Sequence, residues 1–238
     1  MKKVAVLIGN FGSGKTEIAL NLVFEGVKRH KAVLVDLDVI NPYFRSAERK
    51  RELTAAGIKL LHPNFSLTTV DVPSLPPEIR SVFQDDHELV VFDVGGDPAG
   101  ATVLGQYKSD FDALPEGSLE VLFVINPFRP FSAEPQMVTD LYERIRYRAR
   151  LAVTGLVNNA NLSVLASAED LIKGYDIVKS VSERLNIPVR YTCGRAQPLR
   201  AFLQMARERK LEEKYIGEPF EINTYMHRDW DSFTEKGI

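Results

Sequence analysis

Short apolar runs alternate with longer amphipathic segments along most of the chain. The apolar runs are rich in β-branched residues and do not alternate with polar ones, which predicts strands that are buried on both faces. These runs are Val4–Ile8, Ala32–Val35, Leu89–Val94, Val121–Ile125, Ala152–Val157 and Val189–Thr192. The amphipathic segments, which predict helices, are Lys15–His30, Ser132–Tyr147, Ala168–Asn186 and Leu199–Glu213. This alternation predicts an α/β fold: a doubly wound, mostly parallel sheet of about seven or eight strands with helices on both faces.

Two segments interrupt the alternation. Pro63–Pro77 contains four prolines and predicts an irregular loop. The tail from Ile216 carries aromatic residues among charged ones, so we expect it to pack across the domain, with docking to a partner as the alternative. No repeat, low-complexity tract or linker divides the chain. This predicts a single domain over residues 1–238, with a core of about residues 1–210 and an extension over about 211–238.

Composition and charge limit the classes of partner. The 238 residues include 30 Lys and Arg and 32 Asp and Glu, so the formal net charge is −2. A near-neutral chain gives no electrostatic reason to expect nucleic acid as a partner. No apolar run approaches the roughly 20 residues of a membrane span, so no integral membrane association is expected. A single cysteine, Cys193, cannot form an internal disulfide, which favours a reducing, cytoplasmic location.

The strongest motif is the glycine-rich sequence GNFGSGKT, which lies between the first predicted strand and the first predicted helix. It consists of Gly9, Asn10, Phe11, Gly12, Ser13, Gly14, Lys15 and Thr16, and it matches the phosphate-loop pattern G-x-x-x-x-G-K-[ST]. Glycines allow successive backbone N–H groups to turn inward around a phosphate, and the start of the helix adds unpaired amides. Lys15 is then expected to reach the β- and γ-phosphates, and the Thr16 hydroxyl to bind Mg²⁺.

Two acidic clusters stand where predicted strands end. Asp36 and Asp38 lie two residues apart, and in an extended chain such residues share one face. Asp93 ends an apolar strand, as expected of a carboxylate that assists Mg²⁺, and Asp97 follows the Gly95–Gly96 turn. Because ligands of open α/β sheets bind at the carboxyl ends of the strands, we expect these carboxylates near the phosphate loop. The alternative is that they cap the helices that follow.

The order of these motifs resembles that of the MinD/ParA/CobQ-type nucleotide-binding domains, members of the SIMIBI class of P-loop NTPases. Val121–Pro130 (VLFVINPFRP) resembles the family's strand that ends in an Asn/Thr–Pro turn. Gly155–Leu162 (GLVNNANL) resembles the strand whose terminal asparagine reads adenine. Asn186–Leu199 resembles the last strand and the loop that covers the base. The likeness runs from residue 1 to about residue 210.

The resemblance implies roles for the acidic residues. Asp38 would orient the attacking water, which makes it a catalytic residue together with Lys15. Asp36 or Asp93 would act on Mg²⁺ through its water shell, so the candidate metal site consists of these two carboxylates and Thr16. Asp97 would belong to the second switch segment, which responds to the γ-phosphate.

The resemblance also implies a base site. Asn158 or Asn159 would face adenine, and Arg195 flanks the base-covering loop as a candidate phosphate contact. A guanine site of the common kind uses the string N-K-x-D after a strand, whereas residues 158–161 read NNAN. We therefore expect ATP rather than GTP, with ADP as the product and Mg²⁺ as the cofactor.

Two departures from the family pattern bear on assembly. Many MinD-like members carry a second lysine near the start of the loop, which crosses to the other subunit's nucleotide, and this chain has Asn10 there. A homodimer stays open, but a crossing lysine is not implied. The iron-protein branch binds its cluster through paired cysteines, so with Cys193 alone no iron–sulfur cluster is expected. Cys193 is expected to be a small buried residue.

Three functions follow from these observations. The first is an ATPase switch that couples hydrolysis to a protein partner of unidentified kind. The second is a CobQ- or dethiobiotin-synthetase-like enzyme that phosphorylates a small molecule, with Pro63–Pro77 helping to form its acceptor pocket. The third is a module that binds ATP without turning it over.

Overall fold

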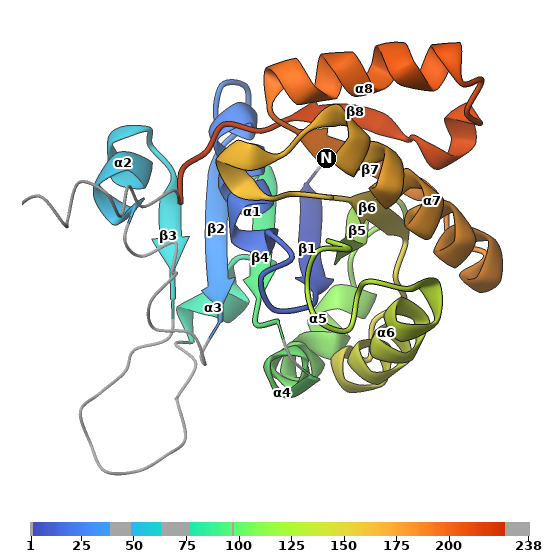
Figure 1. Ribbon diagram of the computed structural model, residues 1–238. Helices are drawn as coiled ribbons and strands as arrows, with labels where there is room; N and C mark the ends of the chain where they lie inside the picture. Colours follow the sequence, from blue (N-terminus) through green and yellow to red (C-terminus); the bar gives the residue numbers. More distant parts are fainter. Residues whose placement is uncertain (1, 39–48, 63–76, 97, 227–238) are drawn as a thin grey trace, which may run out of the picture.

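The apolar runs assemble into one parallel sheet. A computed structural model describes residues 2–38, 49–62, 77–96 and 98–226. In these residues eight strands pair in parallel in the order β3-β2-β4-β1-β5-β6-β7-β8 (Figure 1). The strands are β1 (Lys3–Gly9), β2 (Ala32–Leu37), β3 (Lys59–Leu61), β4 (Leu89–Val94), β5 (Leu119–Ile125), β6 (Gly155–Asn158), β7 (Val189–Gly194) and β8 (Glu218–Glu221). The four central strands are buried along nearly their whole length, which explains their continuous apolar sequences.

Helices connect the strands, and local sequence signals set the ends of the longer ones. The α-helices are α1 (Lys15–Gly26), α2 (Lys50–Ala55), α3 (Glu78–Ser81), α4 (Pro98–Thr102), α5 (Lys108–Asp112), α6 (Pro135–Ala149), α7 (Ala168–Leu185) and α8 (Ala196–Glu208). The 3₁₀ helices are η2 (Val103–Tyr107), η3 (Ser163–Leu165) and η4 (Glu213–Tyr215). Helix α7 begins at a capping box in which the Ser167 hydroxyl accepts from the Asp170 N–H and the Asp170 carboxylate accepts from the Ser167 N–H. It ends at Asn186, which adopts a left-handed conformation.

The sheet separates two hydrophobic cores. In β1, Val4, Val6 and Ile8 pack into a core that is covered by α3 to α8, whereas Ala5 and Leu7 pack into a second core with α1 and α2. Successive side chains of a strand point to opposite faces. A strand that contributes side chains to both cores must therefore be apolar throughout. The structure therefore confirms the predicted doubly wound α/β fold with helices on both faces.

The chain after β8 completes the second core. Ile222 is buried there, and the Tyr225 ring stacks on Phe24 of α1 with 4.7 Å between the ring centroids. The Glu17 carboxylate at the start of α1 accepts hydrogen bonds from the backbone N–H groups of Tyr225 and Met226. The tail thus packs across the domain as far as residue 226, and residues 227–238 lie outside the described part of the chain.

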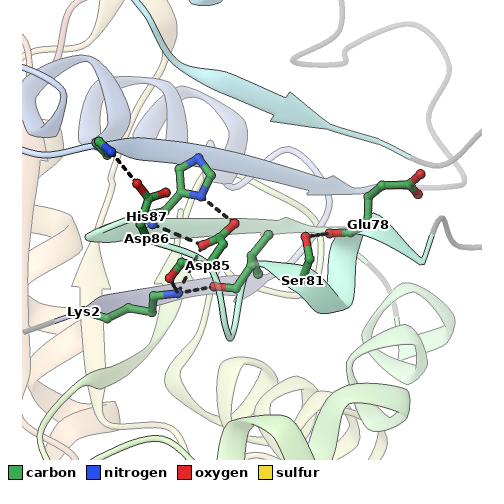
Figure 2. A network of polar contacts seen from close by, with 8 residues as sticks. Lys2, Glu78, Ser81, Asp85, Asp86 and His87 are labelled. Carbon is green, nitrogen blue, oxygen red and sulfur yellow. Dashed lines mark hydrogen bonds and ion pairs between the residues drawn. The ribbon is translucent and has the colours of Figure 1, made fainter.

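At the amino edge of the sheet, polar contacts join the start of β1 to the turn before β4 (Figure 2). The Lys2 ammonium donates to the carbonyl of Val82 and to the carbonyl and carboxylate of Asp85, the last two at 3.0 and 3.2 Å. His87 Nδ1 lies 2.6 Å from the same carboxylate. Burial raises the pKa of Asp85, but hydrogen bonds from His87 and Lys2 outweigh it, so the net pKa lies below its ordinary value.

The structure also contains elements that the apolar pattern does not predict. Strand β8 lies beyond residue 210, where the sequence predicts an extension, and it is short, carries Pro219 and pairs only with β7 among the described strands. Such edge strands lack the apolar signal of central ones. Strand β3 has only three residues, and α2 to α5 have six or fewer residues each. The predicted loop at Pro63–Pro77 lies outside the described residues except for Pro77.

Across the ranges that the structure covers, no helix is both long enough and apolar enough to cross a membrane.

Candidate functional site

The glycine-rich loop connects the carboxyl end of β1 to the start of α1. Gly9, Gly12 and Gly14 have φ values of 147°, 70° and 93°, a region that side chains with a Cβ rarely adopt. A Cβ on Gly14 would also lie only 2.2 Å from Nδ2 of Asn159. That amide in turn donates a 2.7 Å hydrogen bond to the Ser13 carbonyl. The loop therefore needs its glycines both for its conformation and for its close contact with the chain after β6.

Lys15 is folded back onto this loop. Its side chain is buried, with 6% of the residue exposed, and its ammonium donates a 2.9 Å hydrogen bond to the Asn10 carbonyl. The Asn10 side chain points to the loop after β5, where its amide donates to the Pro130 carbonyl and the Ser132 hydroxyl. Phe11 is 60% exposed at the tip. A buried ammonium close to inward-turning amides is the charge distribution that binds a phosphate chain.

Asp36 and Asp93 lie side by side at the carboxyl ends of two neighbouring strands. They are paired in the register of β2 and β4, and only 2% and 1% of the two residues is exposed. One oxygen of Asp36 accepts a 3.0 Å hydrogen bond from the N–H of Asp38. The predicted clustering of the carboxylates beside the phosphate loop is therefore present, with Asp38 directly after β2.

Asp93 has an unusual electrostatic environment. Burial, together with the negative charge of Asp36, raises the pKa of its carboxyl to about 7. Thr16 and Lys15 favour the charged form but do not offset the burial. Thr16 lies close enough to affect the pKa, yet both carboxylate oxygens are without a hydrogen-bond partner of ordinary geometry among the described residues. A buried carboxylate in this state is poised to receive a cation or its water shell.

The arrangement fits Mg²⁺ bound together with phosphates. Mg²⁺ in such sites is held by one or two carboxylates and by the substrate, and it keeps several waters. Asp36, Asp93 and the Thr16 hydroxyl supply oxygen atoms of this kind at one place. No group of three or more His, Cys, Asp or Glu side chains in the described ranges is placed to hold a metal without further ligands. A site that is completed by a bound nucleotide agrees with both observations.

The Gly95–Gly96 turn after β4 packs directly against the phosphate loop. A Cβ on Gly96 would lie 2.5 Å from Cα of Phe11, and one on Gly95 would lie 3.4 Å from a carboxylate oxygen of Asp38. The Gly95–Gly96 turn, which leads into the expected second switch segment, therefore lies against both Asp38 and the phosphate loop. Asp97 lies outside the described residues, so its predicted role remains a prediction.

A cavity of about 810 Å³ extends from the phosphate loop along the carboxyl edge of the sheet. At one end it is lined by Lys15, Thr16 and Asp38. The loops after β5, β6 and β7 and the chain after β8 contribute the rest of the lining, which consists mostly of amides and apolar side chains. These include Asn126, Asn159, Asn161, Leu162, Leu165, Cys193, Arg195, Ile222 and Met226. A cavity that combines a phosphate loop with a lining of mostly amides and apolar side chains suits a nucleotide, which has a phosphate chain and a base.

The two candidate base-reading asparagines are placed differently. Asn158 is fully buried beneath the cavity, where its amide donates to the Leu171 carbonyl and its side-chain oxygen accepts from the Ala160 N–H. Asn159 lines the cavity, and its side-chain oxygen has no hydrogen-bond partner in the part of the chain that the structure describes. Arg195 also lines the cavity, at the start of α8. Both asparagines are 0% exposed, and of the two only Asn159 lines the cavity.

Cys193 is buried, as the sequence predicts. It is 1% exposed, and burial raises the pKa of its thiol above the ordinary value. A thiol in this state is unreactive.

Several cavity residues are not among those that the sequence suggests. Arg129 lies in the loop after β5, in the segment NPFRP, and its Nε donates a 2.9 Å hydrogen bond to the Gly12 carbonyl. Ile222, Thr224 and Met226 come from the tail. The signal for Arg129 is its position in the Asn–Pro turn that resembles the MinD/ParA/CobQ pattern. The tail gives no comparable signal, because its contact with α1 depends on the path of the chain after β8.

Comparison with known proteins gives structural relatives only. No protein-family model matches the chain, and no curated protein sequence matches it. The chain is similar to FtsY from Mycoplasma mycoides, with a TM-score of 0.53 and 14% identity over 83% of this chain and 62% of that one. It is similar to chloroplast FtsY from Physcomitrella patens, with a TM-score of 0.52 and 18% identity over 81% and 58%. The signal recognition particle receptor FtsY from Elizabethkingia anophelis, in complex with GDP, gives a TM-score of 0.51 and 17% identity over 81% and 57%.

The chain spans less than two thirds of the length of these relatives, and the identities are low. The likeness therefore concerns the fold. It does not single out the MinD/ParA/CobQ proteins, since these three relatives are FtsY proteins. The chain shares the α/β fold of these relatives.

Proposed function

We propose that this chain is a Mg²⁺-dependent ATPase of the MinD/ParA/CobQ type that acts as a switch toward a protein partner. The observation that carries the proposal is the pairing of a buried, unbonded Asp93 carboxylate with a complete phosphate loop. A purely structural aspartate in this position would have a partner for its charge. An aspartate that binds the water shell of Mg²⁺ gains a partner for its charge when the nucleotide and the metal bind.

Each residue of the phosphate end has a distinct task in this proposal. Lys15 exchanges the Asn10 carbonyl for the β- and γ-phosphates, and the Thr16 hydroxyl binds the metal. Bound Mg²⁺ supplies positive charge that offsets that of the phosphates and of the buried carboxylates. Asp38, at the edge of the cavity, orients the water that attacks the γ-phosphorus, so that ADP leaves and inorganic phosphate forms.

The contact between the loop and the Gly95–Gly96 turn supports a switch. Because Gly96 abuts Phe11, a change in the loop on loss of the γ-phosphate is transmitted to β4 and to α4, which begins at Pro98. Helix α4 continues into η2, which packs on the first core. A partner that binds these elements would sense the nucleotide state.

The base end of the cavity favours adenine over guanine. The residues that line it are amides, hydroxyl-bearing residues, apolar side chains and one arginine, whereas a guanine site of the common kind places a carboxylate against the base. Among the described residues that line the cavity, two are carboxylates. They are Asp38, at the phosphate end, and Glu17, which is engaged by the N–H groups of Tyr225 and Met226. The FtsY from Elizabethkingia anophelis was solved with GDP, so GTP is the competing nucleotide for the test.

Phosphate release from Mg-ATP and Mg-GTP, measured at equal concentrations below saturation, tests this function. We expect release from ATP that is abolished in the Lys15→Ala variant and several-fold slower release from GTP. Faster release from GTP would contradict the base assignment but not the NTPase. Release no faster than that of Lys15→Ala with either nucleotide would contradict the ATPase itself.

The alternative of a small-molecule kinase rests on Pro63–Pro77, of which residues 63–76 lie outside the described part of the chain. No contact of the described residues favours it over the switch.

A further inference from the structure

We infer that Arg129 is a second phosphate-binding cation, which acts on the nucleotide bound by its own chain. This inference rests on the proposed function and deepens it. Arg129 lines the same cavity as Lys15, and its Nε is held 2.9 Å from the Gly12 carbonyl in the middle of the phosphate loop. The guanidinium carbon lies 3.5 Å from where a Cβ of Gly12 would stand, so the whole head group lies against the loop.

The two cations have the same relation to the loop. The Lys15 ammonium donates to the carbonyl of Asn10, and the Arg129 guanidinium donates to the carbonyl of Gly12. Both cations are therefore bound to the same three-residue segment of the loop. Arg129 forms no ion pair with any described residue. A single hydrogen bond to a neutral carbonyl leaves most of its five N–H donors, and its charge, available to an anion.

The loop that carries Arg129 is built to hold it in place. The Asn126 side chain accepts from the Phe128 N–H at 3.1 Å and donates to the Asn161 carbonyl at 2.9 Å, which fixes the turn after β5. The Asn10 amide donates to the Pro130 carbonyl and the Ser132 hydroxyl on the other side of Arg129.

Strain in the same loop points to a function. Phe131 has a φ of 60° and is 66% exposed, which is an unfavourable conformation for an aromatic residue that gains no burial from it. Such strain persists where the surrounding contacts impose it, and it occurs most often at functional sites. Two contacts hold the chain on either side of Phe131: the Ser132 N–H donates to the Arg129 carbonyl at 3.1 Å, and the Asn10 amide donates to the Pro130 carbonyl and the Ser132 hydroxyl.

The chemistry of the triphosphate calls for a cation at this place. Asp38 lines the cavity, and Asp36 and Asp93 lie close by at the ends of β2 and β4, so negative charge collects beside the phosphate loop, where the proposed function places Lys15 and Mg²⁺ as positive charges. During hydrolysis, charge develops on the oxygens of the transferred group, and a guanidinium can bind two of them at once. Asn10 is then a positioning residue, because it acts through the loop of Arg129.

The ratio of affinities for a triphosphate and a diphosphate tests the inference. Calorimetry with Mg-AMPPNP and Mg-ADP measures both affinities. Arg129→Ala is expected to lower the affinity for the triphosphate by about tenfold or more and the affinity for the diphosphate by less than about threefold. The affinity of Arg129→Lys for the triphosphate should lie between those of Arg129→Ala and the wild type. The exposed Arg144, whose Nε donates to the Asp140 carbonyl of its own helix, provides the matched control Arg144→Ala, which should leave both affinities unchanged.

Several results would overturn the inference. If Arg129→Ala leaves the ratio unchanged, or lowers both affinities equally, Arg129 has only a structural role in the loop. Wild-type protein that binds neither nucleotide would instead remove the proposed function, and with it the basis of this inference. Asn10→Ala should shift the ratio in the same direction, and the double variant should be no worse than Arg129→Ala. Additive effects would contradict the positioning role.

A mixing experiment tests whether Arg129 acts within its own chain. Lys15→Ala subunits keep Arg129 but lack the loop lysine, and Arg129→Ala subunits keep the loop. Hydrolysis by the mixture is expected to equal the sum of the separate activities. Recovery of activity toward that of the wild type would assign Arg129 to the nucleotide of a neighbouring subunit and contradict the inference.

Discussion

Two aspartates at opposite ends of β4 have opposite environments. Asp85, in the turn before the strand, receives hydrogen bonds from Lys2 and His87, and the net effect lowers the pKa of its carboxyl (Figure 2). Asp93, near the end of the strand, is buried beside another carboxylate, and its pKa is raised to about 7. Asp85 therefore has partners within the chain, whereas neither carboxylate oxygen of Asp93 has a hydrogen-bond partner of ordinary geometry among the described residues.

This is the difference expected between a structural carboxylate and the ligand-binding carboxylate that we propose at Asp93. Asp85 stabilises the fold in its charged form, because its partners are part of the fold. Asp93 costs stability in its charged form, and a buried site of this kind persists where a bound cation supplies the missing partner. The contrast predicts that substitutions at the two ends will differ in kind as well as in size.

The largest effect is expected from Lys15→Ala, which removes the loop cation. Affinity for Mg-ATP should fall by about a hundredfold or more, because charge-assisted contacts to the terminal phosphates are lost. Equilibrium titration with a fluorescent ATP analogue measures the change. An affinity within about threefold of that of the wild type would show that Lys15 does not bind the phosphates.

The next effect concerns turnover. Asp38→Ala should leave the affinity for Mg-ATP within about threefold of the wild type and lower the single-turnover rate constant by about a hundredfold, since the water loses its orientation. Rapid-quench measurement of ADP gives the rate. A rate equal to that of the parent would exclude Asp38 from the reaction.

A third substitution should stabilise the nucleotide-free protein. The folded-state pKa of Asp93 is raised above the unfolded value, so its contribution to stability is present at low pH and is lost as pH rises through about 7. Asp93→Asn removes the charge and should exceed the wild type in free energy of unfolding by on the order of 2 kcal/mol at about pH 8, with the gap narrowing towards about pH 5. Urea unfolding in EDTA measures this.

The same substitution should weaken Mg²⁺-dependent nucleotide binding, so stability and function change in opposite directions. A variant that is less stable than the wild type at the higher pH would show that Asp93 already has its partner in the free protein.

The smallest effect is expected at the other end of the strand. The folded-state pKa of Asp85 is lowered, so its contribution is present above the unfolded value and is lost as pH falls through the folded one. Asp85→Asn should therefore be less stable by about 1 kcal/mol near neutral pH, and the gap should close in acid. Nucleotide affinity should not change. If Asp85→Asn instead stabilises the protein as Asp93→Asn does, the proposed difference between the environments of Asp85 and Asp93 is wrong.

The fold and the phosphate end of the site could be predicted because their signals are local. Each central strand is an unbroken apolar run, and the loop from Gly9 to Thr16 is one continuous motif. Strand ends then placed Asp36 and Asp93 at one edge, since the carboxyl ends of parallel strands meet there. The register that makes these two residues direct neighbours has no comparable signal along the chain.

The base end was harder to predict because it is assembled from four separate segments. Asn158 and Asn159 are adjacent, and which of them faces the cavity depends on the path of the chain at the end of β6. The pairing of β6 with β7 shifts register between Leu156 and Val157, an irregularity without a sequence signature. The contribution of Ile222 depends in the same way on the weak edge strand β8.

We expect a bound Mg-nucleotide to provide the partner that Asp93 lacks. Calorimetric titration of Mg-ATP in excess Mg²⁺, repeated in buffers with different ionisation enthalpies, counts the protons released on binding. At about pH 6, where the Asp93 carboxyl is mostly protonated in the free protein, we expect release that approaches one proton per site, falling to near zero at about pH 8. Asp93→Asn should abolish this release. Absence of binding heat in every buffer, or equal proton release by the wild type and Asp93→Asn, would contradict the account.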